Sequence, residues 1–153
     1  MIFDGKLLDF NFIRERLKCL PQSLASLEQQ ISAVILFGSL AMNKQTPLSD
    51  VDLAVLYHKN LSLDELDRLH RQVMGMVTDL LQSDDIDIIN LNTAPLAIQY
   101  GAIKQSKILL LNNREEYIDY WDQTVKYYLD FKPLIDECNN TLLETLSGRT
   151  LYG

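Results

Sequence analysis

One short stretch constrains the fold of this chain more than any other. An apolar, partly β-branched run at 33–37 leads directly into Gly38 and Ser39, and after ten further residues Asp50 and Asp52 open a second apolar run. A run that is apolar at every position is typical of a strand covered on both faces. The pattern therefore predicts two buried strands, joined by a sharp turn and a polar loop.

The second strand, expected at 51–57, places its two carboxylates on one side. Successive side chains of a strand point to opposite faces, so Asp50 and Asp52 share one face and the apolar residues between and after them occupy the other. The two carboxylates stand about 6–7 Å apart at the backbone, so their side chains can converge on one ligand.

Hydrophobic spacing, capping residues and prolines predict the remaining elements. We expect helices at 10–20, 24–31, 62–82, 93–105, 113–132 and 134–146, further strands at 86–91 and 107–111, and a loop at 43–49. Pro21 and Pro133 are expected to end the helices that precede them. The helix at 62–82 is expected to bury a stripe of Leu63, Leu66, Leu69, Val73, Met76 and Leu80. Residues 147–153 are expected to be loose.

These elements indicate an α/β (α+β) domain, because strands and helices mix without strict alternation. We expect a small mixed sheet of about four strands flanked by helices, with a C-terminal helical extension. A single domain would span 1–153, with its core at about 30–111 and its C-terminal helices at about 113–146.

Composition and charge narrow the classes of function. The apolar runs are too short to cross a bilayer and no signal pattern opens the chain, so we expect a cytoplasmic protein that does not enter membranes. A formal charge of −7 disfavours nonspecific binding to nucleic acid, whose phosphate backbone is also negative. Cys19 and Cys138 lack metal-ligand neighbours and are expected to be reduced, partly buried thiols.

The residues around the turn have the chemistry of a phosphate and metal site. Gly38 has no Cβ, so the backbone and the Ser39 hydroxyl can approach phosphate oxygens closely. Asp50 and Asp52 offer the oxygen ligands that Mg²⁺ prefers, and this ion usually shares them with substrate phosphates.

A third carboxylate on an adjacent strand would complete a two-metal arrangement. Asp87 is our choice, while Asp84 and Asp85 are nearby competitors, and Asp85 has the same strand parity as Asp87. Each part alone has a plainer explanation, because a Gly-Ser pair is usually just a turn and a lone aspartate is usually a cap or an edge charge. The joint pattern is much more specific than its parts.

The turn, the ten-residue spacing and the Asp-Val-Asp run together resemble the signature of the minimal nucleotidyltransferases, in the DNA polymerase beta-like superfamily. The resemblance covers 31–111. It implies that Ser39 holds nucleotide phosphate, that Asp50 and Asp52 bind Mg²⁺, and that Asp87 assists metal binding or deprotonation of the acceptor. The implied reaction transfers a nucleoside monophosphate from a nucleoside triphosphate, with pyrophosphate leaving.

The chain departs from that family in one place. Members commonly carry an Ala-Arg-Gly run shortly after the Gly-Ser pair, whereas this chain has Ala41, Met42 and Asn43. Met42 supplies no charge for a triphosphate, so Lys44 is the candidate substitute. We expect the missing arginine to lower the catalytic rate more than the affinity for nucleotide.

Many short proteins of this kind resemble antitoxins that silence a HEPN-type ribonuclease toxin by adding AMP to a toxin tyrosine. The resemblance implies ATP as nucleotide donor and such a toxin as partner. On the C-terminal helix Tyr117, Trp121 and Tyr128 fit one buried stripe. Tyr120 and Tyr127 fall off that stripe and are candidates for a partner surface, and the alternative is that all of these aromatic residues pack against the domain itself. Two alternatives stay open: a transferase acting on a small hydroxyl compound such as an aminoglycoside, and a binding-only inhibitor with weak turnover.

Overall fold

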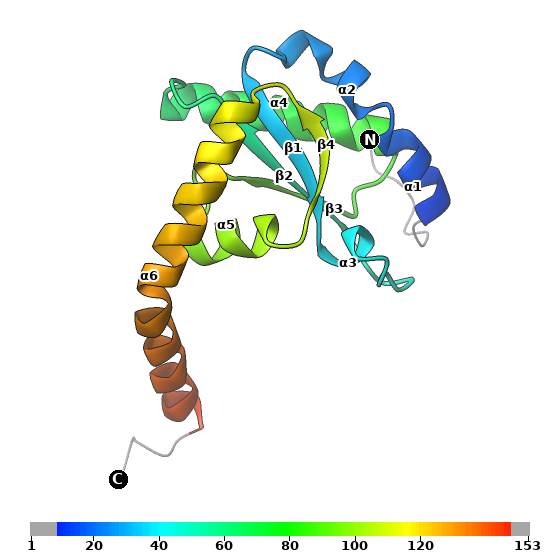
Figure 1. The fold of residues 1–153 in the computed structure, drawn as a ribbon. Coiled ribbons are helices and arrows are strands. Elements are labelled where there is room, and N and C mark those ends of the chain that lie inside the picture. The colour runs from blue at the N-terminus through cyan, green and yellow to red at the C-terminus, as the bar shows by residue number, and fades with distance from the viewer. Residues whose placement is uncertain (1–8, 148–153) are drawn as a thin grey trace.

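A computed structural model describes residues 9–147 and shows a four-stranded sheet with helices on both faces (Figure 1). In chain order its elements are α1 (Phe10–Leu17), α2 (Leu20–Ser23), the 3₁₀ helix η1 (Ala25–Leu27), β1 (Ile31–Phe37), α3 (Gly38–Ala41), β2 (Val51–Tyr57), α4 (Leu63–Leu81), β3 (Ile86–Asn90), α5 (Leu96–Ile103), β4 (Lys107–Leu111) and α6 (Arg114–Leu146). None of the helices within 9–147 is long and apolar enough to cross a membrane.

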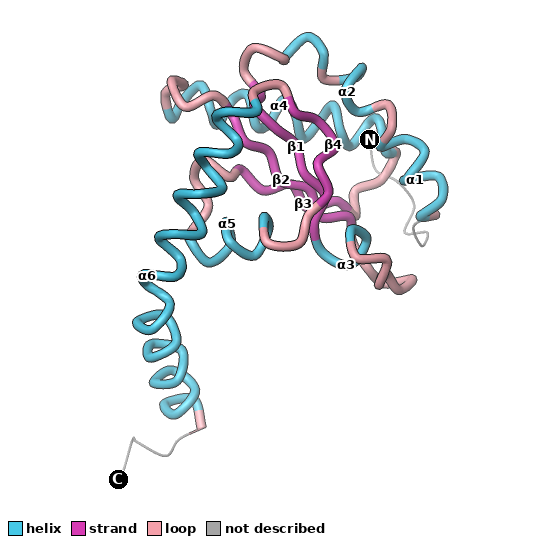
Figure 2. Tube along the Cα trace, viewed as in Figure 1, coloured by secondary structure: helices cyan, strands magenta, loops and turns pink. Residues whose placement is uncertain are grey.

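The sheet is mixed, as predicted. Its strand order is β3-β2-β1-β4, with β1 antiparallel to both β2 and β4, and β2 parallel to β3 (Figure 2). The central strands β1 and β2 are buried along almost their whole length, which is the expected consequence of apolar residues at nearly every position.

Two hydrophobic clusters flank the sheet. The first joins α1, α2 and α4 to β2 residues that include Val51, Leu53 and Val55. The second joins α5 and the start of α6 to Ala54 and Leu56. Because strand side chains alternate, Asp52 lies on the same face as Ala54 and Leu56, and this is the face that α5 and α6 cover.

Several predicted elements are confirmed. The strands at 51–57 and 107–111 have the predicted bounds, β1 begins two residues earlier than predicted, and β3 ends one residue earlier. Ser62 and Glu65 form the predicted capping box, since the Ser62 hydroxyl accepts from the Glu65 N–H at 3.2 Å and the Glu65 carboxylate accepts from the Ser62 N–H at 3.1 Å.

The N-terminal helix boundaries were predicted wrongly. Pro21 does not end a helix but lies in the first turn of α2, where its missing N–H costs no hydrogen bond. Ile31 is not helical, because it begins β1 and pairs with Tyr57 of β2. Gly38 and Ser39 form more than a turn, since they begin the short helix α3.

The buried stripe of α4 differs from the predicted one at both ends. Leu63 is exposed, while Val77 and Leu81 are buried in place of Met76 and Leu80, which pack at the edge of the cluster. Helical periodicity does not choose between these adjacent stripes, because both have nearly the same spacing. The position of the sheet beneath α4 makes the choice.

The prediction that Pro133 ends a helix was also wrong. Helix α6 runs through Pro133 without interruption. Pro133 and Leu129 are both exposed there, so water can satisfy the Leu129 carbonyl that receives no N–H from the proline. Cys138 is exposed rather than partly buried. The predicted loose segment lies, from residue 148 on, outside the described residues.

Candidate active site

The register of the sheet brings the predicted carboxylates together. Strands β2 and β3 are parallel neighbours, and Asp52 and Asp87 are paired residues in their register. Asp50 lies two residues before Asp52 and just ahead of the strand, so all three residues gather where β2 and β3 begin.

The pKa of the Asp52 carboxyl reflects the proximity of the other two carboxylates. Burial raises the pKa of the half-buried Asp52 carboxyl, and the negative charges of Asp87 and then Asp50 raise it further. Asp84 and Asp85 precede β3, whereas Asp87 is its second residue. The Asp85 carbonyl instead accepts a hydrogen bond from the Val51 N–H at 3.1 Å and so extends the β2–β3 pairing. Of the three candidates for a third carboxylate, Asp87 is the one that faces Asp52.

The donor set fits a hard divalent cation, although its side chains are not gathered around one point. Within residues 9–147 no three acidic, histidine or cysteine side chains are arranged closely enough to hold an ion as they stand. Asp50 and Asp87 are exposed, so their side chains can turn apart, and mutual repulsion favours that separation. Carboxylate oxygens that repel one another on adjoining strands suit Mg²⁺ chemically, because the cation would remove the repulsion.

Gly38 is built into the same site. It follows Phe37, which pairs with Asp52 across β1 and β2. Its φ of +74° favours glycine, and a Cβ at this position would overlap Asp52 Oδ2 and stand 3.0 Å from Asp52 Cγ. A side chain at this position would force the Asp52 carboxylate to move away from the turn.

Ser39 and Lys44 lie on the loop that follows Gly38. Ser39 is half-buried, whereas the next two residues of α3 enter the core. Its carbonyl accepts a hydrogen bond from the Lys44 N–H at 2.8 Å, which closes the loop. Among residues 9–147 no group hydrogen-bonds the Ser39 hydroxyl, and Lys44 is exposed. The Ser39 hydroxyl is therefore not engaged by another described residue, and the Lys44 side chain reaches solvent.

The sequence did not reveal the contribution of Arg14. From α1 its guanidinium donates to Asn43 Oδ1 at 2.8 Å, to Gln45 Oε1 at 3.4 Å and to the Leu40 carbonyl at 3.5 Å. All three acceptors belong to the segment that carries Ser39 and Lys44. Nothing in the spacing of α1 indicated this contact, because Arg14 and Asn43 are 29 residues apart.

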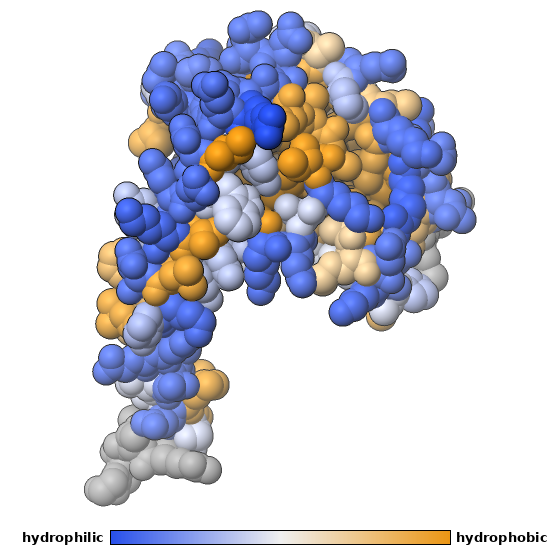
Figure 3. Space-filling view, in the orientation of Figure 1, coloured by the Kyte–Doolittle hydropathy of each residue, from blue (hydrophilic) through white to orange (hydrophobic). Residues whose placement is uncertain are grey.

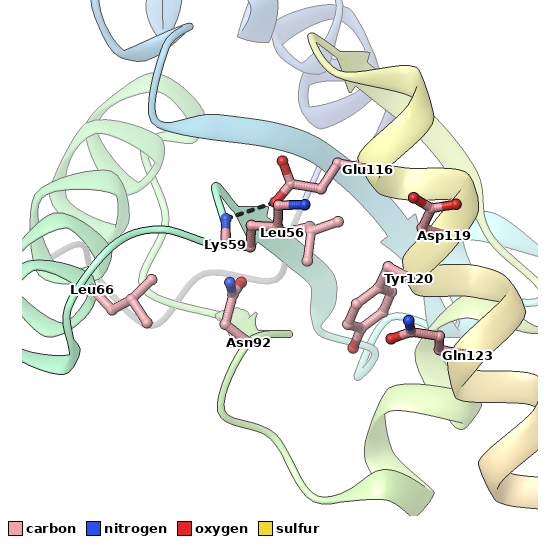
Figure 4. A pocket seen from close by; sticks show the side chains of 8 residues that line it. All are labelled: Leu56, Lys59, Leu66, Asn92, Glu116, Asp119, Tyr120 and Gln123. Carbon is pink, nitrogen blue, oxygen red and sulfur yellow. Dashed lines mark hydrogen bonds between the residues drawn. The ribbon is translucent and has the colours of Figure 1, made fainter.

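A separate hollow lies at the other end of β2 (Figure 4). Its lining residues are Leu56, Lys59, Leu66, Asn92, Glu116, Asp119, Tyr120 and Gln123. Several of its polar groups are engaged inside the fold: Glu116 Oε1 accepts from the Lys59 N–H at 2.7 Å, and the Tyr120 hydroxyl donates to the Leu91 carbonyl at 2.9 Å. Tyr120 therefore packs against the domain and joins α6 to the segment after β3, whereas Tyr127 is 51% exposed.

Comparison with known families fits this geometry. A sequence model described as "Polymerase beta, Nucleotidyltransferase" matches residues 22–115, well over half of the chain. The chain belongs to this nucleotidyltransferase family. The matched range contains Gly38, Ser39 and all three carboxylates, whereas Arg14 and most of α6 lie outside it. A search of curated proteins gave no match.

Solved structures share the fold of this nucleotidyltransferase. A toxin–antitoxin structure with AMP-PNP has 22% identity and a TM-score of 0.57, with 86% of this chain and 98% of that chain covered. A complex of tri-AMPylated Shewanella oneidensis HEPN toxin with MNT antitoxin has 19% identity and a TM-score of 0.56, covering 82% and 97%. The toxin–antitoxin pair MntA–HepT has 19% identity and a TM-score of 0.57, covering 82% and 97%. At these identities the likeness concerns the fold.

Proposed function

We propose that this nucleotidyltransferase is an antitoxin that transfers AMP from Mg-ATP to a tyrosine of a HEPN-type ribonuclease toxin. The observation that carries the proposal is the pairing of Asp52 with Asp87 beside Gly38, because it sets two carboxylates next to the Gly38–Ser39 turn in a member of this family. The choice of acceptor is supported by the fold, which is similar to that of an MNT antitoxin solved with its AMPylated HEPN toxin.

In the proposed reaction the tyrosine oxygen forms a bond to the α-phosphorus of ATP, and the bond from that phosphorus to the bridging oxygen of pyrophosphate breaks. Asp87, which is exposed, would take the tyrosine proton. The Ser39 hydroxyl and the backbone at Gly38 would hold phosphate oxygens, and Lys44 would add positive charge. Mg²⁺ held by Asp50 and Asp52, with Asp87 beside them, would neutralise the triphosphate and favour the deprotonated acceptor.

The test is transfer of label to a defined protein. The full chain is incubated with ATP labelled at the α-phosphate, with MgCl₂ and with the purified product of the adjacent gene, which is the gene next to the one that encodes this chain and the expected source of the toxin. We expect label on a tyrosine of that product and loss of its ribonuclease activity. An unlabelled product would contradict the proposal, and label on an added aminoglycoside instead would support the small-molecule alternative.

A matched pair of double variants separates catalysis from binding. Asp50→Ala with Asp52→Ala removes two site carboxylates, whereas Asp64→Ala with Asp67→Ala removes two exposed carboxylates of α4 and changes the net charge equally. We expect only the first pair to abolish transfer and silencing. Silencing that survives in that variant would support the binding-only inhibitor.

A further inference from the structure

The C-terminal part of α6 projects away from the sheet. Residues 129–146, which we call the distal arm, belong to a helix of 33 residues that is about 50 Å long at 1.5 Å per residue. In Figure 1 the arm extends beyond α5 and past the level of α3. Figure 3 shows hydrophobic side chains among the hydrophilic ones along this projecting helix.

The arm continues the face with which α6 packs on the domain. Three residues of α6 that precede the arm make this packing. Tyr117 is buried, the Thr124 hydroxyl donates to Gln99 Oε1 at 3.4 Å, and Tyr128 stacks on Tyr100 with ring centroids 3.9 Å apart. At helical spacing the same face continues into the arm as an apolar stripe. The stripe consists of Phe131, Leu134, Ile135, Cys138, Leu142 and Leu146.

This face looks toward the side of the sheet that carries the carboxylates. The packed part of α6 covers the cluster that contains Ala54 and Leu56, and Asp52 shares their face of β2. A protein seated on the apolar stripe would therefore lie beside α5, on the face and toward the end of the sheet where Asp52 and Asp87 stand. That position suits a macromolecular acceptor.

The charge of the arm indicates what kind of protein fits it. The arm has a formal charge of −3, because it carries four acidic residues and one basic residue. These are Asp130, Asp136, Glu137 and Glu144, and Lys132. Two copies of the arm would bring like charges together, in chains whose formal charge is already −7 each. A partner with a basic rim around an apolar groove complements both features.

We propose that the distal arm is the docking helix for the acceptor protein, which receives the apolar stripe in a groove with a basic rim. The identity of the occupant rests on the proposed function. The docking surface does not rest on the proposed function, because the exposure, spacing and charge of its residues define it whether or not the chain transfers AMP.

Two pairs of substitutions on the arm test the proposal. Phe131→Glu with Leu142→Glu changes the stripe, where these side chains are 50% and 56% exposed. Leu129→Glu with Asn140→Glu is the matched control, because both positions are exposed and lie on the opposite side of the helix from the stripe. Both pairs add the same charge to solvent-exposed positions. Binding to the purified product of the adjacent gene is measured by calorimetry without ATP, and circular dichroism verifies that both variants fold.

We expect the stripe variant to bind at least about 10-fold more weakly and the control to bind within about 3-fold of the unmodified chain. Equal binding by both variants, or no binding by the unmodified chain, would overturn the proposal. So would a dimer of the chain alone, detected by light scattering, that the stripe variant dissociates, because a second copy would then occupy the arm. Stripe-dependent binding without AMP transfer would leave this inference standing while the proposed function fails.

Discussion

Gly38 approaches Asp52 so closely that a methyl group on its Cα would overlap the carboxylate oxygen Oδ2. The turn and the carboxylate come from two strands, β1 and β2, and meet because Phe37 and Asp52 are paired in the sheet. The absence of a side chain at Gly38 is therefore a requirement of the site as well as of the turn.

Gly38→Ala should damage both stability and activity. Its φ of +74° strains any other residue and its Cβ would displace Asp52, so we expect the free energy of unfolding to fall by about 1–2 kcal/mol and transfer to fall at least about 10-fold. Urea denaturation and the labelled-AMP assay measure these effects. In the control Gly75→Ala, the new Cβ meets nothing within 4 Å on an exposed helix, so stability should rise by about 1 kcal/mol with transfer unchanged. Full activity in Gly38→Ala would contradict the close approach.

Asp52→Asn should stabilise the chain at neutral pH when no divalent cation is present. Because the pKa of Asp52 is raised, the folded state binds this proton more tightly than the unfolded state, so stability decreases as pH rises from the ordinary value of 3.8 through the raised pKa. Solvent screening limits the expected gain to below about 1 kcal/mol. The gain should vanish in acid, as denaturation curves at two pH values would show. Asp67→Asn, which breaks an exposed ion pair with Arg71 and removes a negative charge near His70, should give no such gain at neutral pH.

Mg²⁺ should raise the melting temperature of the unmodified chain. An ion bound at about 10 times its Kd adds about 1.4 kcal/mol, which corresponds to a rise of about 3–6 °C for a chain of this size. Thermal unfolding with and without MgCl₂ measures the effect. The combination of Asp50→Asn with Asp52→Asn should remove it, whereas Asp64→Asn with Asp67→Asn should not. An equal rise in both double variants would place the ion elsewhere.

Arg14→Gln should raise the KM for ATP by about 10-fold, because the loop that carries Ser39 and Lys44 loses its hydrogen bonds to the guanidinium on α1. Arg16→Gln is the matched control on the same helix. Its guanidinium donates to the Leu80 carbonyl at 2.8 Å, so this variant should lose stability without a change in KM. Arg14→Lys should restore part of the affinity. Equal KM values for the two glutamine variants would show that Arg14 has only a structural role.

His70 should make the stability depend on pH below neutrality. It joins α4 to the sheet, with Nδ1 2.7 Å from the Tyr57 hydroxyl and Nε2 3.0 Å from the Ile88 carbonyl, and burial lowers its pKa below 6.5. The unfolded state therefore takes up a proton first, so stability should fall as pH drops from 6.5 through the lowered pKa. His70→Gln should flatten this part of the stability profile, and His58→Gln should retain it. Denaturation across pH 5 to about 8 measures both.

The elements that depend on local chemistry were predictable. The bounds of β2 and β4, the capping box of α4 and the Asn113 cap of α6 follow from nearest-neighbour patterns in the chain. The errors at Pro21, Ile31 and Pro133 arose where the rest of the fold decides. Ile31 belongs to β1 because it pairs with Tyr57 of β2. Pro133 is tolerated inside α6 because water can satisfy the carbonyl that receives no N–H from the proline.

The sequence by itself determined which residues carry the chemistry: a glycine and a serine after a buried strand, and carboxylates of one parity on the next strand. Only the tertiary structure decided that Asp87 rather than Asp84 or Asp85 faces Asp52, because that choice depends on the register between two strands. The same holds for Arg14, which reaches the loop across the fold. Periodicity specifies the face of a single element, but proximity between elements is set by how their faces pack together.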